Sequence, residues 1–522
     1  MNSNQINLAF ESEVQNASNW LDGKVLGICG YSTTVLKDRL IQRLVEVALG
    51  PYRSLAAGLL RSGRDGISIA GTRIDCGQAH FELGSGRIAV PLFRWMRAQM
   101  EFFVHWAYCL TAIVAVSNER KTDSPVVLVF GVGEESLFQD GCDSRFVSYC
   151  RAGPIKPLRA GRRYIVQSAT RGVCSTDQSF SYCRSPLIGL LRESRIGFMG
   201  RLVMLVNHLA LLFTYALATL RFPTFSLLAR DFAYGGISAE IERRGLIASV
   251  ILTSSNYTNQ PLWTRVLPCS RIHMVWYSQN VKPIVYKSDG TESDIPNQRW
   301  TRIGTLWLWT AALAEYAKRI IPDAKIEVVG PILWYLPEIS QPPEDRLCIA
   351  IFDVPALTDD TAWWVGLFPN YYCATNLSAF LDDIIGLKAG LEKCFQLPVS
   401  FALKTKRQYY PSYDRSYFDY LEHLGLTGAI SLVPHETNMY ALISGSHLVM
   451  AYPFSSPAYI ADALGISSIY YDPTDSIVRC DFGDPPSLIQ FARTKGELRD
   501  LSFAALERAM DDANGRPSNY VV

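Results

Sequence analysis

The last third of the chain alternates short apolar runs with segments of helical periodicity. Leu347–Val354 is an apolar run of strand length, and Phe380–Phe395 follows it with apolar residues at helical spacing. Strand and helix patterns then alternate as far as Pro473, beginning with a strand and ending with one, over residues 399–407, 415–426, 429–434, 438–445, 446–453, 456–465 and 467–473. Such alternation is typical of a parallel sheet covered by helices on both faces. The pattern predicts a Rossmann-like domain from about Gln341 onward.

The upstream part of the chain carries fewer clear signals. Val126–Phe138, Ala248–Tyr257 and Arg271–Asn280 are strand-like runs that end in polar residues. A proline-containing linker, Pro331–Arg346, follows the last strand pattern of this part and is the best candidate domain boundary. Because 522 residues exceed what one core usually organises, we expect an α/β protein of two domains. The first would cover residues 1–335, with helical insertions, and the second residues 336–522, with a terminal helix.

Two apolar segments raise the question of membrane contact. Leu202–Leu220 is uncharged and close to the length of a membrane span, and Phe102–Ser117 is a shorter apolar run. If both segments spanned, the part between them would be translocated together with its cations, which the positive-inside rule opposes. These cations are Arg151, Lys156, Arg159, Arg162 and Arg163. Buried helices remain an alternative, and we expect peripheral association with the membrane rather than spanning.

The composition excludes several classes of protein. The chain has 48% hydrophobic and 19% charged residues and a formal net charge of +1, so nothing in its overall charge favours nucleic acid as a partner. Its 12 cysteines are scattered without zinc-ligand spacing, and no Asp-x-Asp motif stands out, so we expect no metal. The N-terminus has neither a basic leader nor an apolar core, which predicts a cytoplasmic protein.

Polar residues follow the predicted strands of the last third, where an open α/β sheet binds its ligand. The cations after residue 403 suit a phosphate or a carboxylate. Pro457 is favoured in a first helical turn, so one of the two serines before it would cap a helix whose N-terminus can receive a phosphate. The candidate binding residues are Asp353, Lys404, Lys406, Arg407, His435, Glu436, Thr437, Ser455 and Ser456.

This arrangement resembles the GT-B glycosyltransferases that build bacterial surface polysaccharides. The likeness lies in the strand ending in Lys404–Arg407, the polar segment at the next strand end, and the run from Pro453 to Pro473. It is strongest for enzymes that use CMP-activated acidic sugars such as Kdo or sialic acids. The resemblance implies two Rossmann-like domains that face a central cleft, the second binding the nucleotide-sugar donor and the first facing the acceptor. Pro434 and His435 reverse the His-Pro order of many CMP-dependent members, so a UDP or GDP donor stays open.

The resemblance also implies an acid or base from the first domain, because glycosyl transfer requires a proton to leave the acceptor hydroxyl. Glu134 and Glu135 follow a predicted strand directly and are the candidates, with Asp353 and His273 as further ones. Tyr277, Ser278, Gln279 and Asn280 end another strand and would hydrogen-bond sugar hydroxyls of a glycan or glycolipid acceptor. No cofactor is expected beyond the donor substrate.

Two other functions remain open. A nucleotide-sugar 2-epimerase has two similar domains and a nucleotide in its cleft, but it needs no affinity for membranes, and the apolar segment Leu202–Leu220 speaks against it. A non-catalytic assembly protein that retains a nucleotide site is the second alternative. It would be favoured if Glu134 and Glu135 faced away from the site.

Overall fold

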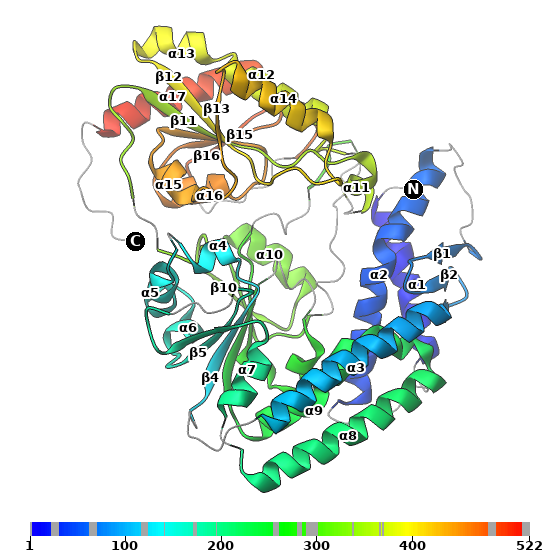
Figure 1. The fold of residues 1–522 in the computed structure, drawn as a ribbon. Helices are drawn as coiled ribbons and strands as arrows, with labels where there is room; N and C mark the ends of the chain where they lie inside the picture. Colours follow the sequence, from blue (N-terminus) through cyan, green and yellow to red (C-terminus); the bar gives the residue numbers. More distant parts are fainter. Residues whose placement is uncertain are drawn as a thin grey trace. The chain divides into compact units, whose positions relative to one another are not determined.

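The chain divides into two compact units in a computed structural model (Figure 1). The structure describes residues 3–21, 31–61, 70–115, 124–139, 141–170, 175–194, 196–253, 260–278, 284–288, 301–336, 339–364, 367, 370–478 and 487–513. The first unit comprises Met1–Tyr277, Asp294–Leu308 and Tyr316–Leu336. The second comprises Ser278–Ser293, Trp309–Glu315 and Pro337–Val522. The main change of unit along the chain therefore falls between Leu336 and Pro337.

The first unit is built on a parallel sheet of seven strands in the order β10-β9-β8-β7-β4-β5-β6. Numbered along the chain from β4 and read from the β6 edge, this order is 3-2-1-4-5-6-7, the Rossmann order with one added strand. The chain reverses its direction of travel between β4 and β7, which are neighbours in the sheet. The strands are β4 (Val126–Phe130), β5 (Tyr164–Gln167), β6 (Phe180–Cys183), β7 (Ile247–Thr253), β8 (Ile272–Val275), β9 (Thr305–Leu308) and β10 (Lys325–Val328).

The rest of the first unit is mainly helical. The long helices α1, α2, α3, α8 and α9, together with the short antiparallel sheet β1-β2-β3, enclose a second apolar core that contains Leu40, Phe102 and Phe232. The elements of this part are α1 (Ser3–Leu21), α2 (Thr33–Arg61), β1 (Arg73–Asp75), β2 (His80–Glu82), β3 (Arg87–Ala89), α3 (Leu92–Val114), α8 (Phe198–Arg221), η1 (Pro223–Leu228) and α9 (Ala229–Arg243). The shorter helices beside the seven-stranded sheet are α4 (Glu134–Leu137), α5 (Ser144–Ala152), α6 (Lys156–Arg159), α7 (Pro186–Glu193), η2 (Leu262–Val266) and η3 (Cys269–Arg271).

The segment Leu202–Leu220 forms most of α8, the one helix among the described residues that is long and apolar enough to cross a membrane. It lies side by side with α3 along the edge of the first unit (Figure 1). The indole of Trp106 stacks on the ring of His208 at 5.1 Å, and each side chain donates a hydrogen bond to the other residue's carbonyl at 2.8 Å. The outward side of this helix pair exposes Leu92, Phe93, Met96, Met100, Phe103, Val104, Tyr108, Val114, Phe198, Met199, Leu202, Val203, Val206, Leu209, Phe213, Leu217 and Leu220.

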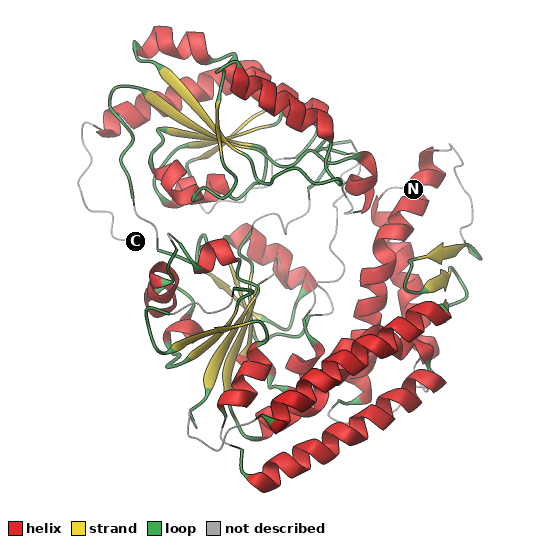
Figure 2. Ribbon diagram, in the orientation of Figure 1, coloured by secondary structure: helices red, strands yellow, loops and turns green. Residues whose placement is uncertain are grey.

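The second unit is built on a parallel sheet of six strands in the order β13-β12-β11-β14-β15-β16. Along the chain this is 3-2-1-4-5-6, so the predicted Rossmann-like domain is confirmed. Figure 2 shows helices on both faces of this sheet. The strands are β11 (Leu347–Phe352), β12 (Val399–Lys404), β13 (Ser431–Val433), β14 (Leu448–Ala451), β15 (Ser468–Tyr471) and β16 (Ile489–Ala492).

The structure differs from the elements predicted for the second unit in one helix and one strand. Phe380–Phe395 is not one helix, because the chain turns at Gly386–Leu387 between α12 and α13. The strand ending at Tyr471 is not the last one, since β16 adds to the sheet beside it. Helix α10 (Ala311–Ile320) follows β9 along the chain, and the division between the two units falls inside it. The helices of the second unit are α11 (Asp359–Trp364), α12 (Ala374–Ile385), α13 (Lys388–Phe395), α14 (Arg415–Leu426), α15 (Met439–Ser444), α16 (Pro457–Ala463) and α17 (Lys495–Ala513).

Candidate functional sites at the carboxyl edges of the two sheets

A cavity of about 570 Å³ opens at the carboxyl ends of the central strands of the first unit. Its wall includes Phe130 at the end of β4, Gln167 at the end of β5 and Trp263 in the segment that follows β7. The crevice between β4 and β7 is the point where strand order reverses, and ligands of open α/β sheets bind at such points. Gly131 has a φ of +80°, a conformation that glycine adopts without strain. Its N–H donates a hydrogen bond to the side-chain oxygen of Gln167 at 3.3 Å. We call this cavity the sheet-edge pocket.

Glu134 lines the sheet-edge pocket, where three donors hold its carboxylate. The Oε2 atom accepts from the hydroxyls of Ser168 at 3.0 Å and Thr170 at 2.6 Å, and Oε1 accepts from the Ala169 N–H at 2.6 Å. Partial burial raises the pKa of Glu134, but the hydrogen bonds from Thr170, Ala169 and Ser168 outweigh it, so the pKa lies below its ordinary value. The carboxylate is therefore ionised at neutral pH, and one lone-pair direction remains for a ligand.

Glu135, the neighbouring candidate, has a different environment. Its side chain is exposed and folds back over Gly133, where an added Cβ would meet Oε1 at 2.3 Å. It is not among the residues of the sheet-edge pocket. Of the two candidates, Glu134 is thus the one that the fold aims at the cavity.

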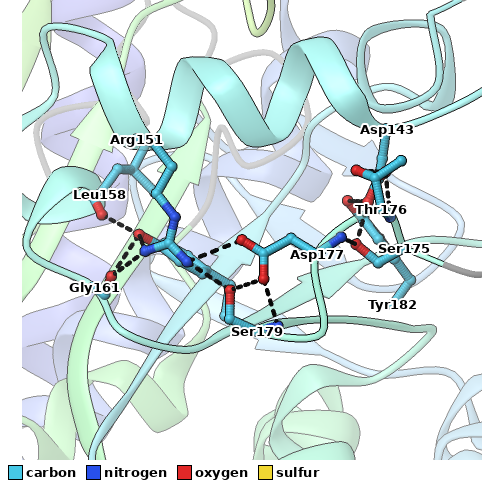
Figure 3. A network of polar contacts seen from close by, with 10 residues as sticks. Asp143, Arg151, Leu158, Gly161, Ser175, Thr176, Asp177, Ser179 and Tyr182 are labelled. Atoms are coloured by element: carbon cyan, nitrogen blue, oxygen red, sulfur yellow. Dashed lines mark hydrogen bonds and ion pairs between the residues drawn. The ribbon is translucent and has the colours of Figure 1, made fainter.

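The loop between β5 and β6 is anchored on both sides of the undescribed residues 171–174. Ser168–Thr170 are held by Glu134, and Ser175 and Thr176 are held by Asp143, whose two oxygens accept from both hydroxyls and from the Thr176 N–H at 2.9 Å (Figure 3). In the same network the guanidinium of Arg151 bonds Asp177 at 3.2 Å and Ser179 at 2.6 Å (Figure 3). The donors of Glu134 therefore lie on a segment that the fold holds firmly.

Sequence reasoning missed several charged residues of the sheet-edge pocket. Arg39 on α2 and Asp231 on α9 form a buried ion pair in its wall, with Nε to Oδ2 at 3.0 Å, and Arg184 and Arg230 also line it. The one local signal was Asp231 in the first turn of an α-helix, a common place for an acidic residue. Nothing in the sequence indicated that α2 would bring Arg39 to the same place.

The predicted acceptor residues follow β8. Tyr277 and Ser278 are half-buried, and Gln279 and Asn280 lie outside the described residues. His273, the alternative catalytic candidate, lies inside β8 and is 7% exposed, and burial lowers its pKa to about 4. It is not among the residues that line the sheet-edge pocket, and a buried neutral imidazole of this kind suits the core.

In the second unit, Asp353 follows β11 directly and is 4% exposed. Its Oδ1 accepts from the backbone N–H of Lys406 at 3.0 Å, and its Oδ2 accepts from the Tyr417 hydroxyl at 2.9 Å. Burial raises the pKa of Asp353 to about 6, although these hydrogen bonds and the nearby lysines act in the opposite direction. Asp353 therefore shapes the cation-bearing loop after β12.

That loop and the segment after β13 meet at the edge of the sheet. The Nζ atom of Lys404 donates to the His435 carbonyl at 2.6 Å, and the amide nitrogen of Gln408 donates to His435 Nε2 at 3.2 Å. Arg407 and His435 line a cavity of about 910 Å³, whose other side is apolar and formed partly by α14. Glu436 is exposed and pairs with His435 Nδ1 at 3.0 Å. The structure thus brings the cation cluster and the His435 segment together, as predicted from sequence.

The side chain of Asn438 caps the N-terminus of helix α15. Asn438 accepts from the N–H groups of Tyr440 at 2.9 Å and Ala441 at 3.4 Å, whereas Thr437 closes a turn on the Pro434 carbonyl at 3.0 Å. Asn438, and neither Thr437 nor Glu436, therefore caps this helix. Asparagine is among the best N-cap residues, and its position one residue later decides the outcome.

Ser456 occupies the N-cap position of α16, as predicted, but its side chain makes no capping hydrogen bond. Ser455 is 2% exposed, and its hydroxyl donates to the Tyr452 carbonyl at 2.8 Å. The preceding residue, Phe454, has a φ of 63°, a conformation that costs energy for a bulky side chain and is concentrated at functional sites. The two serines thus have separate environments, and of the two it is Ser456 that occupies the cap position.

No group of three or more His, Cys, Asp or Glu side chains that could hold a metal ion occurs in the part of the chain that the structure describes. The arrangement offers instead an ionised carboxylate in the first unit and cations with a helix N-terminus in the second.

These features define an α/β protein of two parallel sheets, each in Rossmann order and each with polar residues gathered at the carboxyl edge. The family described as "Polysaccharide biosynthesis PFTS motif protein" matches residues 210–501, more than half of the chain. The chain belongs to this family. No curated protein matches its sequence.

Three of the solved structures that match the chain are the following. The pneumococcal O-GlcNAc transferase GtfA in complex with UDP and GlcNAc is 11% identical, with 54% of this chain and 53% of that chain covered and a TM-score of 0.31. The wall teichoic acid polymerase TagF is 12% identical, with coverages of 81% and 91% and a TM-score of 0.35. MurG of Acinetobacter baumannii is 9% identical, with coverages of 76% and 96% and a TM-score of 0.32. The chain spans about half the length of the first of these, and at such values none indicates a substrate for this chain.

Proposed function

We propose that this chain is a metal-independent glycosyltransferase of the GT-B type that acts in polysaccharide biosynthesis. The observation that carries the proposal is Glu134, an ionised and firmly oriented carboxylate in a cavity at the point where the strand order of the first sheet reverses. Membership of a family described by polysaccharide biosynthesis supports the same reading.

The second unit would bind a nucleotide-activated sugar. Lys404 and Arg407 supply positive charge near the His435 segment, and Ser456 stands at the start of a helix on the same edge of the sheet. Guanidinium and ammonium groups suit the phosphates of a nucleotide. A CMP-linked acidic sugar is the favoured donor, with UDP and GDP sugars as alternatives.

Glu134 would act as the general base on the acceptor. An ionised carboxylate within hydrogen-bonding distance of an acceptor hydroxyl can take its proton as that oxygen attacks the anomeric carbon of the donor, while the nucleotide phosphate leaves with the bonding electrons. The donors from Ser168, Ala169 and Thr170 fix the orientation of the carboxylate, and they also limit its basicity. A base already ionised at neutral pH compensates for that limit.

The acceptor would be a growing glycan or a glycolipid, reached from the cytoplasm at the inner face of the membrane. The charged and aromatic wall of the sheet-edge pocket, with Arg184 and Trp263, suits a sugar that carries polar substituents.

The experiment is a thermal-shift panel of CMP, UDP and GDP, followed by a transfer assay with the sugar of the nucleotide that binds. A ligand that binds the folded state alone raises the midpoint of unfolding with its occupancy. Stabilisation by one nucleotide and transfer of its sugar to a glycan supports the proposal. Absence of stabilisation by all three at millimolar concentration would count against it.

A further inference from the structure

A second cavity of about 390 Å³ lies against the sheet-edge pocket in the first unit. Its wall comes from α2, α3 and the beginning of α9, and it contains Arg39, Arg43, Arg94, Arg97 and Arg230. Two carboxylates, Glu101 and Asp231, accompany these five arginines. We call this cavity the arginine pocket.

The carboxylates do not balance the arginines. Arg39 forms an ion pair with Asp231 at 3.0 Å, and Arg43 forms one with Glu46. Arg94, Arg97 and Arg230 make no ion pair with any carboxylate among the residues that the structure describes. Three arginines without an ion pair therefore line this cavity. Of the two carboxylates among the described residues of its wall, Asp231 is paired with Arg39, and Glu101 has no arginine partner. Such a site favours a ligand with two or more negative charges, and guanidinium forks match phosphate oxygens in geometry.

The two cavities share part of their walls. Arg39, Arg230 and Asp231 line both the arginine pocket and the sheet-edge pocket that contains Glu134. The two cavities are therefore adjacent, as a ligand with a phosphate among the arginines and a sugar beside Glu134 would require.

The helix that carries Arg94 and Arg97 also exposes large apolar side chains. Arg94 and Arg97 lie on α3, next to Phe93 and Met96, which are 71% and 55% exposed. The neighbouring helix α8 continues this surface, for example with Phe213 at 73% exposure, and its sequence contains two arginines and no acidic residue. Large contiguous apolar surfaces bordered by arginine are typical of proteins that lie in a membrane interface, where arginine contacts anionic headgroups.

We propose that the arginine pocket binds the phosphate or diphosphate group of a lipid-linked acceptor whose hydrocarbon chain lies along the α3–α8 surface in the membrane. The inference rests on the proposed function, since it names the substrate class that would reach Glu134. In this arrangement Arg94, Arg97 and Arg230 hold the phosphate, and the sugar attached to it extends into the sheet-edge pocket. The membrane-facing surface includes α3 as well as the apolar segment of α8.

The test measures binding of farnesyl diphosphate, farnesol and inorganic diphosphate to the full chain by calorimetry. The phosphate and the hydrocarbon both contribute in the proposal, so farnesyl diphosphate should bind at least about tenfold more tightly than either of the others. The triple variant R94Q/R97Q/R230Q should weaken this binding at least about tenfold. A matched variant, R87Q/R346Q/R499Q, removes the same charge from exposed surface sites and should bind as the parent does.

Three results would overturn the inference. One is unchanged binding of farnesyl diphosphate by the arginine variant, and a second is equally tight binding of inorganic diphosphate, which would indicate a soluble phosphate ligand. The third is a stable dimer that buries α3 and α8 and does not sediment with phosphatidylglycerol vesicles. Nucleotides should stabilise the second unit of the arginine variant as they do that of the parent. If no nucleotide stabilised the parent itself, that result would count against the glycosyltransferase and not against the lipid site.

Discussion

The guanidinium of Arg39 donates through Nε to Asp231 Oδ2 at 3.0 Å, across 192 positions of sequence. The pair joins α2 to α9, and both side chains line both cavities of the first unit. Asp231 also accepts from the Leu262 N–H at 3.2 Å, so its carboxylate fixes the η2 segment of the same wall. A structural ion pair thus forms part of the wall that the two cavities share.

Removing one member of this pair should destabilise the first unit. Among the described residues, Asp231→Asn would leave the buried charge of Arg39 with Glu46 at 3.8 Å as its ion-pair partner, and breaking a buried pair typically costs about 3–5 kcal/mol. We expect a lower urea midpoint for unfolding of the first unit, measured by circular dichroism. As a control, Asp419→Asn breaks the exposed pair of Arg415 and Asp419, which should change stability by less than about 1 kcal/mol. Equal effects of the two variants would contradict the structural role of Asp231.

The catalytic proposal predicts different results at adjacent glutamates. Glu134→Gln should preserve nucleotide binding and lower the turnover of sugar transfer by about a hundredfold or more, the usual scale for a positioned base. Glu135→Gln is the matched control, because its side chain is exposed and lies outside the pocket, and it should transfer sugar at nearly the parent rate. Steady-state kinetics with the identified donor checks both.

Glu134 also anchors the loop Ser168–Thr170, and its two roles must be separated. Thr170→Val removes the hydroxyl that donates to Glu134 at 2.6 Å but keeps the carboxylate. This variant should lose far less turnover than Glu134→Gln. A loss as large as that of Glu134→Gln would show that the carboxylate acts only by holding the loop.

The burial of Asp353 predicts a distinct pH dependence. Its pKa of about 6 in the folded protein lies above the ordinary value of 3.8, so the folded state takes up this proton first as the pH falls. The ionised carboxylate therefore costs stability above about pH 6, and this cost disappears towards about pH 4. Asp353→Asn should be more stable than the parent at pH 7.5, by on the order of 3 kcal/mol, and should approach the parent near pH 4.

The free energy of unfolding in urea, measured for the second unit's transition at several pH values, checks this. Asp345→Asn is a suitable control because the Asp345 side chain is 82% exposed. A difference between Asp353→Asn and the parent that stayed constant from pH 4 to pH 7.5 would be incompatible with a raised pKa.

The two serines before α16 should respond differently to replacement by alanine. Ser455→Ala removes a buried hydroxyl that bonds the Tyr452 carbonyl and should lower stability by about 1 kcal/mol. Ser456→Ala removes a hydroxyl that makes no capping hydrogen bond, and it should weaken nucleotide binding if that hydroxyl contacts the donor phosphate. Thermal unfolding with and without nucleotide separates the two effects. Unchanged nucleotide affinity in the double variant would remove Ser455 and Ser456 from the donor site.

The sequence by itself determined the local elements of the second unit and the residues at their ends. The apolar periodicity predicted α14 and the strands from β11 to β15, since alternation of apolar and polar positions depends on neighbours a few residues apart. The same local logic placed Lys404, His435 and Ser456 at strand ends and a helix start.

Only the tertiary structure decided which of these ends become sites. Strand order places β4 beside β7 and so puts Glu134, but not Glu135, into a cavity with Asp231. Burial converts Asp353 from an expected ligand contact into a support for the Lys406 loop. The exposed side of α3 and α8 follows from which of their faces pack on each other and on α9. These outcomes depend on pairings between residues far apart in the chain, and local periodicity carries no information about them.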